Sequence, residues 1–106
     1  MILAVVLGGF FYLRDGSVPG MGPPSYADTM KTVTLYATEW CGYCAKTREF
    51  FDEHDVPYVE IDIEKSEQGA REHARLGGNG IPVVVVDETV IHGFSPDRML
   101  AALDAP

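Results

Sequence analysis

A chain of 106 residues, of which 46% are hydrophobic, has room for one folded domain and enough apolar side chains to build its core. Sixteen acidic residues against eight basic ones leave a net charge of −8, which excludes the basic face that a nucleic-acid binder needs and disfavours anionic lipid. A secreted scaffold built on disulfides would need more than the two cysteines present.

Residues 1–13 (MILAVVLGGFFYL) form an unbroken apolar run. A helix of this length would reach about 20 Å, which is short of a hydrocarbon core of roughly 30 Å. We expect a membrane anchor here, and two alternatives stay open: a secretory signal, although no Lys or Arg precedes the run, and a segment that is disordered or packs on the domain. Arg14 and Lys31 follow the run, which favours a cytoplasmic location for the domain.

Gly and Pro are frequent in residues 14–30, which show no apolar periodicity. This composition is typical of a flexible linker. The folded domain is therefore expected to span residues 31–106, beginning at Lys31.

The first half of the domain predicts a strand, a helix and a second strand. Residues 33–37 alternate with a period of two, as a half-buried strand does, and residues 58–63 repeat the pattern with their apolar residues on one face. Residues 41–54, between them, are predicted to form a helix. Its inward stripe is expected to consist of Tyr43, Thr47, Phe50 and Phe51.

The second half begins with a predicted helix and continues with a hairpin. Ser66 is suited to cap a helix that ends at Gly77-Gly78. Residues 81–86 are apolar on both faces, as a central strand between two helix layers requires. A turn at residues 87–88 then leads into a short strand at residues 89–91.

Ser95 and Pro96 are a capping residue and a first-turn proline, so the last helix is expected to run from here to about Leu103. The resulting order, βαβαββα, makes the first strand pair parallel and the last pair antiparallel. The predicted fold is thus α/β, with a four-stranded mixed sheet flanked by helices on both faces.

The motif that carries chemistry is Trp40-Cys41-Gly42-Tyr43-Cys44, placed where the first strand passes into the first helix. Free N–H groups and the helix dipole stabilise negative charge at such a position, so we expect Cys41 to be a thiolate at neutral pH. Cys44, one turn further on, is expected to be less exposed, with a pKa closer to its ordinary value. Cys41 would then attack a substrate disulfide, and Cys44 would resolve the mixed disulfide.

Two alternatives compete with redox chemistry at these cysteines. A structural cysteine pair at this spacing would close almost no loop and would stabilise the fold little. A zinc site needs four ligands, and the chain offers three histidines besides the two cysteines. We expect His54 and His73 to face solvent, which leaves His92 as a single additional ligand, so neither alternative is favoured.

Two further segments are candidates for substrate binding. Ile81-Pro82 opens a strand that is predicted to be central, where proline is unexpected because it cannot donate to the ladder. A cis bond facing the cysteines and an ordinary proline at a strand start explain it equally well. Gly93-Phe94-Ser95-Pro96 places a helix start behind a glycine, which suits a carboxylate, although a plain strand-to-helix turn explains the same residues.

Residues 31–104 are similar to a glutaredoxin through four motifs that occur in family order: Val33-Thr34-Leu35-Tyr36, Trp40-Cys41-Gly42-Tyr43-Cys44, Gly80-Ile81-Pro82-Val83 and Ile91-His92-Gly93-Phe94. The resemblance implies a thioredoxin fold, Cys41 as nucleophile, Cys44 as resolving thiol and Pro82 in cis. It also implies a groove in which the Ile81 backbone holds glutathione. The residues expected to bind glutathione or substrate are Tyr43, Ile81, Pro82, Gly93, Phe94 and Ser95.

Several positions depart from the glutaredoxin pattern. Gly42 stands where the family usually has Pro, Thr38 where it has a Lys that supports the thiolate and glutathione, and Ser95 where it has an Asp that contacts the glutathione amine. His92-Gly93 replaces a Gly-Gly pair. Phe94-Ser95-Pro96-Asp97 is instead similar to the glutaredoxin-like redoxins that serve ribonucleotide reductase and take electrons from thioredoxin reductase.

Together these features predict a monomeric thiol–disulfide oxidoreductase that reduces protein disulfides or glutathione mixed disulfides, with glutathione as electron donor and no tightly bound cofactor. Two alternatives stay open. One is a redoxin reduced by thioredoxin reductase, a flavin-dependent enzyme, and the other is a carrier of a [2Fe–2S] cluster held by Cys41 and glutathione. Gly42 motivates the second, because motifs that lack the Pro are more permissive for a cluster. The domain is expected in the cytoplasm, with residues 1–13 as its membrane tether.

Overall fold

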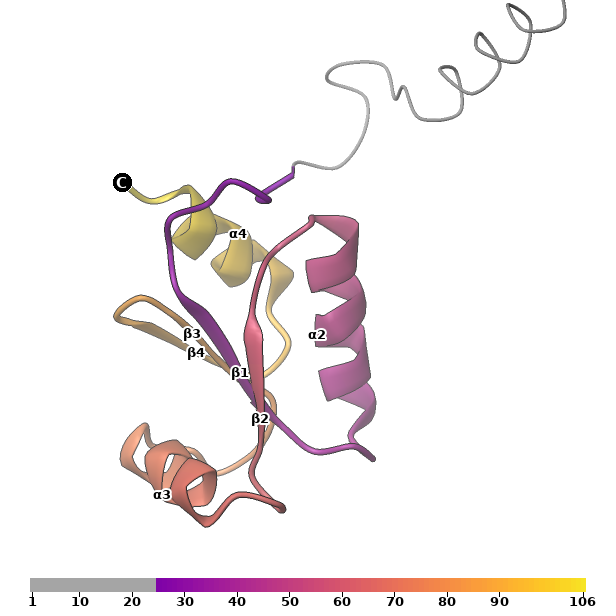
Figure 1. The fold of residues 1–106 in the computed structure, drawn as a ribbon, viewed down its shortest axis with the longest axis vertical. Coiled ribbons are helices and arrows are strands. Elements are labelled where there is room, and N and C mark those ends of the chain that lie inside the picture. Colours follow the sequence, from indigo (N-terminus) through magenta and orange to yellow (C-terminus); the bar gives the residue numbers. More distant parts are fainter. Residues whose placement is uncertain (1–24) are drawn as a thin grey trace, which may run out of the picture.

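The computed structural model describes residues 25–106, and it confirms the predicted α/β fold. Four strands form one mixed sheet in the order β2-β1-β3-β4, in which β1 and β2 are parallel and the other neighbours are antiparallel (Figure 1). Along the chain the elements are β1 (Val33–Ala37), α2 (Gly42–Glu53), β2 (Val59–Asp62), α3 (Glu67–Arg75), β3 (Val83–Val86), β4 (Thr89–His92) and α4 (Pro96–Asp104).

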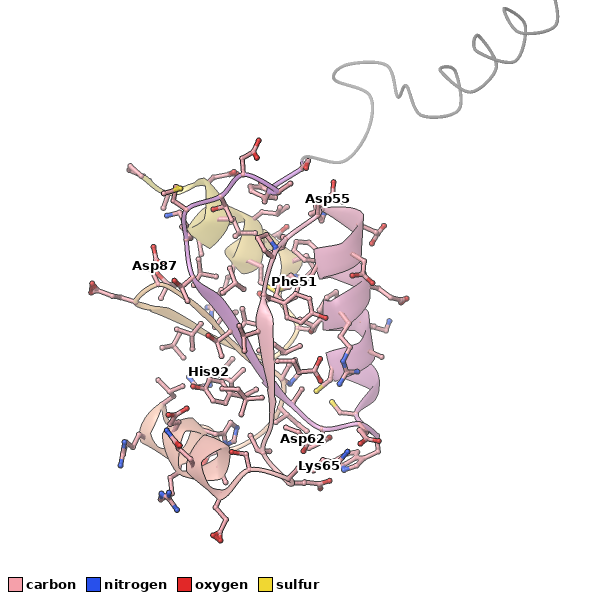
Figure 2. The ribbon with its side chains drawn as sticks, viewed as in Figure 1. Phe51, Asp55, Asp62, Lys65, Asp87 and His92 are labelled. Atoms are coloured by element: carbon pink, nitrogen blue, oxygen red, sulfur yellow. The ribbon has the colours of Figure 1, made fainter. Side chains whose placement is uncertain are left out.

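The two faces of the sheet are covered by different helices, because successive side chains of a strand point to opposite faces. The main hydrophobic cluster lies on the face covered by α2 and α4, and its largest members are Leu35, Phe50, Phe51, Ile91 and Met99. Figure 2 shows Phe51 between α2 and the sheet. Tyr36 points to the opposite face, where its hydroxyl donates to Glu72 Oε1 of α3 at 3.1 Å. The predicted placement of helices on both faces is therefore confirmed.

Helix α2 begins and ends where the sequence predicts. Cys41 has an extended backbone and caps the first turn, and Asp55, with φ of 53°, turns the chain after the last one. The buried residues of the helix are Cys44, Thr47, Phe50 and Phe51. The predicted inward position of Tyr43 is wrong, since 61% of this residue is exposed. Cys44 takes the inward position of the first turn, which leaves Tyr43 on the outer side of the helix.

Helix α3 also has the predicted ends, because Ser66 Oγ accepts the Gly69 N–H at 2.9 Å and Gly77 has a positive φ of 77°. The prediction that His73 faces solvent is wrong. Its ring is buried on the sheet side of α3, 6.3 Å from the Tyr36 ring, and its Nε2 lies 2.8 Å from the Gly80 carbonyl oxygen. A carbonyl accepts only, so this nitrogen carries the proton.

Contacts of the domain begin ahead of Lys31, the predicted start. The Tyr26 N–H donates to the His54 carbonyl at 2.7 Å, and the Tyr26 hydroxyl donates to Asp104 Oδ1 at 2.8 Å. The predicted anchor at residues 1–13 and most of the predicted linker lie outside the described residues. Within residues 25–106, no helix is long and apolar enough to cross a membrane.

The close approach of His73 to the backbone predicts that Gly78→Ala is destabilising. A Cβ at Gly78 would lie 2.4 Å from two atoms of the His73 ring, so the ring must leave its place beside the Gly80 carbonyl. We expect a loss of about 1–3 kcal/mol in the free energy of unfolding, measured by urea denaturation. Gly42→Ala is the control, because a Cβ there meets nothing within 4 Å. Equal stabilities of the two variants would contradict the packing described.

Candidate active site

The two cysteines meet at the junction of β1 and α2. The Cys44 backbone N–H donates to Cys41 Sγ at 3.2 Å, and the Ala45 N–H donates to the Cys41 carbonyl at 3.1 Å. Both thiols are free. Cys41 keeps 8% of its surface exposed, whereas Cys44 keeps none, so only Cys41 meets solvent at all. The helix end thus gives one of its free N–H groups to the Cys41 sulfur, a contact that stabilises negative charge on sulfur.

Burial raises the pKa of the Cys44 thiol to about 12. Its hydrogen bond to Cys41 and the charge of Cys41 also raise this pKa, whereas a hydrogen bond from the Thr38 backbone and the positive charge of Arg48 lower it. The prediction that the pKa of Cys44 lies near its ordinary value is wrong, because no water reaches this sulfur to solvate a thiolate. Cys44 is therefore protonated at neutral pH.

Arg48 is a site residue that the sequence analysis missed. Its Nη2 donates to the Thr38 carbonyl at 3.0 Å, and its Nε and Nη2 donate to the two carboxylate oxygens of Glu60 at 2.9 and 2.7 Å. One side chain thus joins α2, the loop before Cys41 and strand β2. Arg48 follows Cys44 by four residues, and this helical spacing could have indicated that both lie on one side of α2.

A second set of contacts fixes the loop that carries Trp40. The Trp40 Nε1–H donates to Glu64 Oε2 at 3.0 Å, and Lys65 forms an ion pair with Glu39. Figure 2 places Asp62 and Lys65 beside the loop that leads from β1 into α2. Despite its hydrogen bond, 70% of Trp40 is exposed. An indole held at the surface next to Cys41 offers a flat apolar contact to a protein.

The Ile81–Pro82 peptide bond is cis, as the resemblance to glutaredoxins implies. Pro82 is fully buried, and its carbonyl accepts the Gly93 N–H at 2.8 Å, which ties the start of β3 to the end of β4. A cleft of about 410 Å³ opens beside this bond. Its lining residues are Gly77, Asn79, Gly80, Ile81, His92 and Gly93. Of the residues predicted to bind glutathione or substrate, Ile81 and Gly93 therefore share one cleft.

Tyr43 and Phe94 form a separate contact at the start of α2. Their rings are stacked at a centroid distance of 6.5 Å, and Lys46 Nζ lies 5.8 Å from the centre of the Tyr43 ring. Ser95 is the residue before α4, but its side chain makes no capping hydrogen bond. Neither ring belongs to the lining of the cleft. Four of the six predicted binding residues thus divide between the cleft and an aromatic pair, whereas Pro82 and Ser95 belong to neither.

The histidines do not gather around the cysteines. His73 is bound to the Gly80 carbonyl, His54 ends α2 far from the Cys41 end, and His92 is an exposed residue of β4 opposite Val83. Within the part of the chain that the structure describes, no three His, Cys, Asp or Glu side chains are grouped so as to hold a metal ion.

Comparisons with known proteins agree with this geometry. The family model described as Glutaredoxin matches residues 33–91. The glutaredoxin-like protein NrdH of Lactococcus lactis is 25% identical over 67 residues, which cover 63% of this chain and 93% of the relative. A glutaredoxin of Neisseria meningitidis is 31% identical over 68 residues, covering 62% and 80%. The structure of the glutaredoxin-like NrdH-redoxin from Escherichia coli superimposes with a TM-score of 0.65 at 23% identity, covering 71% and 99%.

The difference between the two thiols predicts selective alkylation. With a pKa of about 12, Cys44 is a thiolate in roughly one molecule in ten thousand at about pH 8. The first equivalent of iodoacetamide is therefore expected on Cys41, as located by fragmentation of the labelled peptide. Cys44→Ser should label at the wild-type rate and Cys41→Ser far more slowly. Equal labelling of both sulfurs in the wild-type chain would contradict the assignment.

Proposed function

Since the chain belongs to the glutaredoxin family of thiol–disulfide oxidoreductases, we propose that it reduces disulfides of other proteins through Cys41 and Cys44 and is itself reduced by a flavin-dependent disulfide reductase. The observation that carries the proposal is the unequal setting of the two thiols. Cys41 Sγ accepts an N–H at the start of α2, whereas Cys44 is sealed from solvent and protonated.

The reaction proceeds in two exchanges. The Cys41 thiolate attacks one sulfur of the substrate disulfide, forms a mixed disulfide, and releases the other substrate sulfur as a thiolate that takes up a proton. Cys44 then loses its proton and attacks the Cys41 sulfur, which forms the Cys41–Cys44 disulfide and releases the second substrate thiolate. A reductase returns two electrons to the pair and closes the cycle.

The surroundings of Cys41 favour a protein as substrate. The exposed indole of Trp40 lies directly before it in the chain, and the Tyr43–Phe94 pair extends the aromatic surface along the start of α2. The cleft beside the cis Ile81–Pro82 bond has room for a short extended segment of the partner. Aromatic residues of this kind bury large area at low entropic cost in protein contacts.

The choice of electron donor rests on charge. Glutathione carries two carboxylates at neutral pH, yet the described residues that line the cleft include no Lys or Arg. Thr38, at the position of the glutaredoxin Lys, is buried, and Ser95 replaces the Asp of the family pattern. The relatives named NrdH include one described as having a thioredoxin-like activity profile, which supports a flavin-dependent donor here. Glutathione is the second candidate, because Ile81 lines a cleft of suitable size.

A coupled assay separates the two donors. The chain is given a protein disulfide substrate such as insulin together with NADPH and either thioredoxin reductase or glutathione with glutathione reductase. We expect faster NADPH oxidation with thioredoxin reductase, because the cleft offers glutathione no cation. Faster turnover with glutathione would reverse the assignment of the donor while leaving the dithiol chemistry intact.

Two variants test the dithiol chemistry itself. Cys41→Ser is expected to abolish turnover of the protein disulfide, because the proposed nucleophile is lost and the remaining thiol, Cys44, is fully buried. Cys44→Ser is expected to stop turnover but to leave a mixed disulfide on Cys41, visible as added mass under non-reducing conditions. Activity that survives Cys41→Ser would overturn the proposed function.

A further inference from the structure

The burial that keeps Cys44 protonated also opposes the ionisation that Cys44 needs in order to resolve a mixed disulfide. To resolve a mixed disulfide, this sulfur must ionise where no water solvates it, and burial is the main cause that raises its pKa. The two causes that Cys41 adds, a hydrogen bond and a charge, end once Cys41 is bonded to the substrate. What then favours ionisation of Cys44 is the Thr38 backbone and Arg48.

Arg48 is fixed in place rather than mobile. Three hydrogen bonds hold its guanidinium, one to the Thr38 carbonyl and two to Glu60, and about three-quarters of its side chain is withdrawn from solvent, the exposed fraction being 26%. The Thr38 backbone N–H reaches the Cys44 sulfur, while the Thr38 carbonyl accepts from Arg48. One residue of the loop thus links the cation to the resolving thiol.

We propose that Arg48, partly neutralised by Glu60, is a positioning residue that sets the rate at which Cys44 resolves the mixed disulfide. Glu60 is 30% exposed and lies on β2, opposite Leu35 of β1 and on the face that α2 covers. Its carboxylate holds the guanidinium fork and offsets part of the positive charge. Arg48 therefore favours the ionisation of Cys44, and Glu60 opposes it by offsetting the charge of Arg48. This inference rests on the proposed roles of Cys41 and Cys44.

Among the described residues, the third ionisable group that acts on Arg48, besides Glu60 and Cys44, is Tyr58, which precedes β2. Burial, followed by the charges of Glu60 and Asp52, raises its pKa, so it stays neutral at the pH where the reaction runs. The ionisation of Tyr58 therefore does not affect the rate of resolution near neutral pH. This rate depends on Cys44, on the charges of Arg48 and Glu60, and on whether Cys41 is bonded to the substrate.

The two steps can be timed separately in the full chain with one equivalent of dithiobis(nitrobenzoate). The Cys41 thiolate attacks this aromatic disulfide and releases one coloured thiolate while the other half stays on Cys41. Cys44 then gives its proton to water and attacks Cys41 Sγ, which forms the Cys41–Cys44 disulfide and releases the second coloured thiolate. Stopped-flow absorbance resolves both releases, and the pH dependence of the second one reports the ionisation of Cys44.

Substitutions of Arg48 and Glu60 are expected to change the second release only. Arg48→Met should slow it about fivefold near neutral pH, the scale of one partly exposed ionic interaction, and move its pH profile to higher pH. Arg48→Lys keeps the charge and should recover most of the rate. Glu60→Gln should accelerate the second release, because the cation is no longer neutralised. Arg71→Met, which removes an exposed cation of α3, is the matched control and should change neither step.

The outcomes separate this inference from the proposed function. Equal second releases in wild type and Arg48→Met, or slowing by Glu60→Gln as well as by Arg48→Met, would overturn the inference, because the pair would then act only as a structural brace. A missing first release in the wild-type chain, or a first release that survives Cys41→Ser, would overturn the proposed function instead.

Discussion

The 3.2 Å hydrogen bond from the Cys44 backbone N–H to the Cys41 sulfur ties the first turn of α2 to the redox motif. It gives an N–H of the helix end a partner and places the sulfur of Cys41 at the positive end of the helix dipole. The same turn carries Cys44 into the core, where its sulfur is fully buried. One helix start therefore gives two chemically identical thiols different surroundings: Cys41 accepts an N–H and keeps part of its surface in solvent, whereas Cys44 is buried and protonated.

The rest of the domain supports this junction from three sides. Arg48 and Glu60 join α2 to β2 and to the loop before Cys41, and Trp40 is held by Glu64 from the β2–α3 loop. On the third side, the cis-proline segment is braced by His73, which donates to the Gly80 carbonyl. These braces come from elements that the sheet order brings together, since β1 lies between β2 and β3. The geometry of the site therefore depends on the sheet topology as well as on the Cys41–Cys44 motif.

Period-two alternation, an apolar run, turn residues and capping residues were enough to predict the strands, helices and their order that the structure shows in residues 25–106, because each signal is local. The placement of both cysteines at the start of α2 was predictable for the same reason. The buried His73 and the Arg48–Glu60 pair were not, since both depend on contacts between residues distant in sequence. Tyr43 was misplaced because positions 43 and 44 both fit a helical stripe, and only the packed first turn decides between them.

Unequal ionisation of the two thiols can be followed by the ultraviolet absorbance of thiolate in the reduced chain as the pH is raised. The burial of Cys44 predicts a step of thiolate absorbance near pH 12 that is present in the wild-type chain and missing in Cys44→Ser. Complete ionisation of both sulfurs well below pH 12, or a step near pH 12 that persists in Cys44→Ser, would contradict the unequal burial of the two thiols.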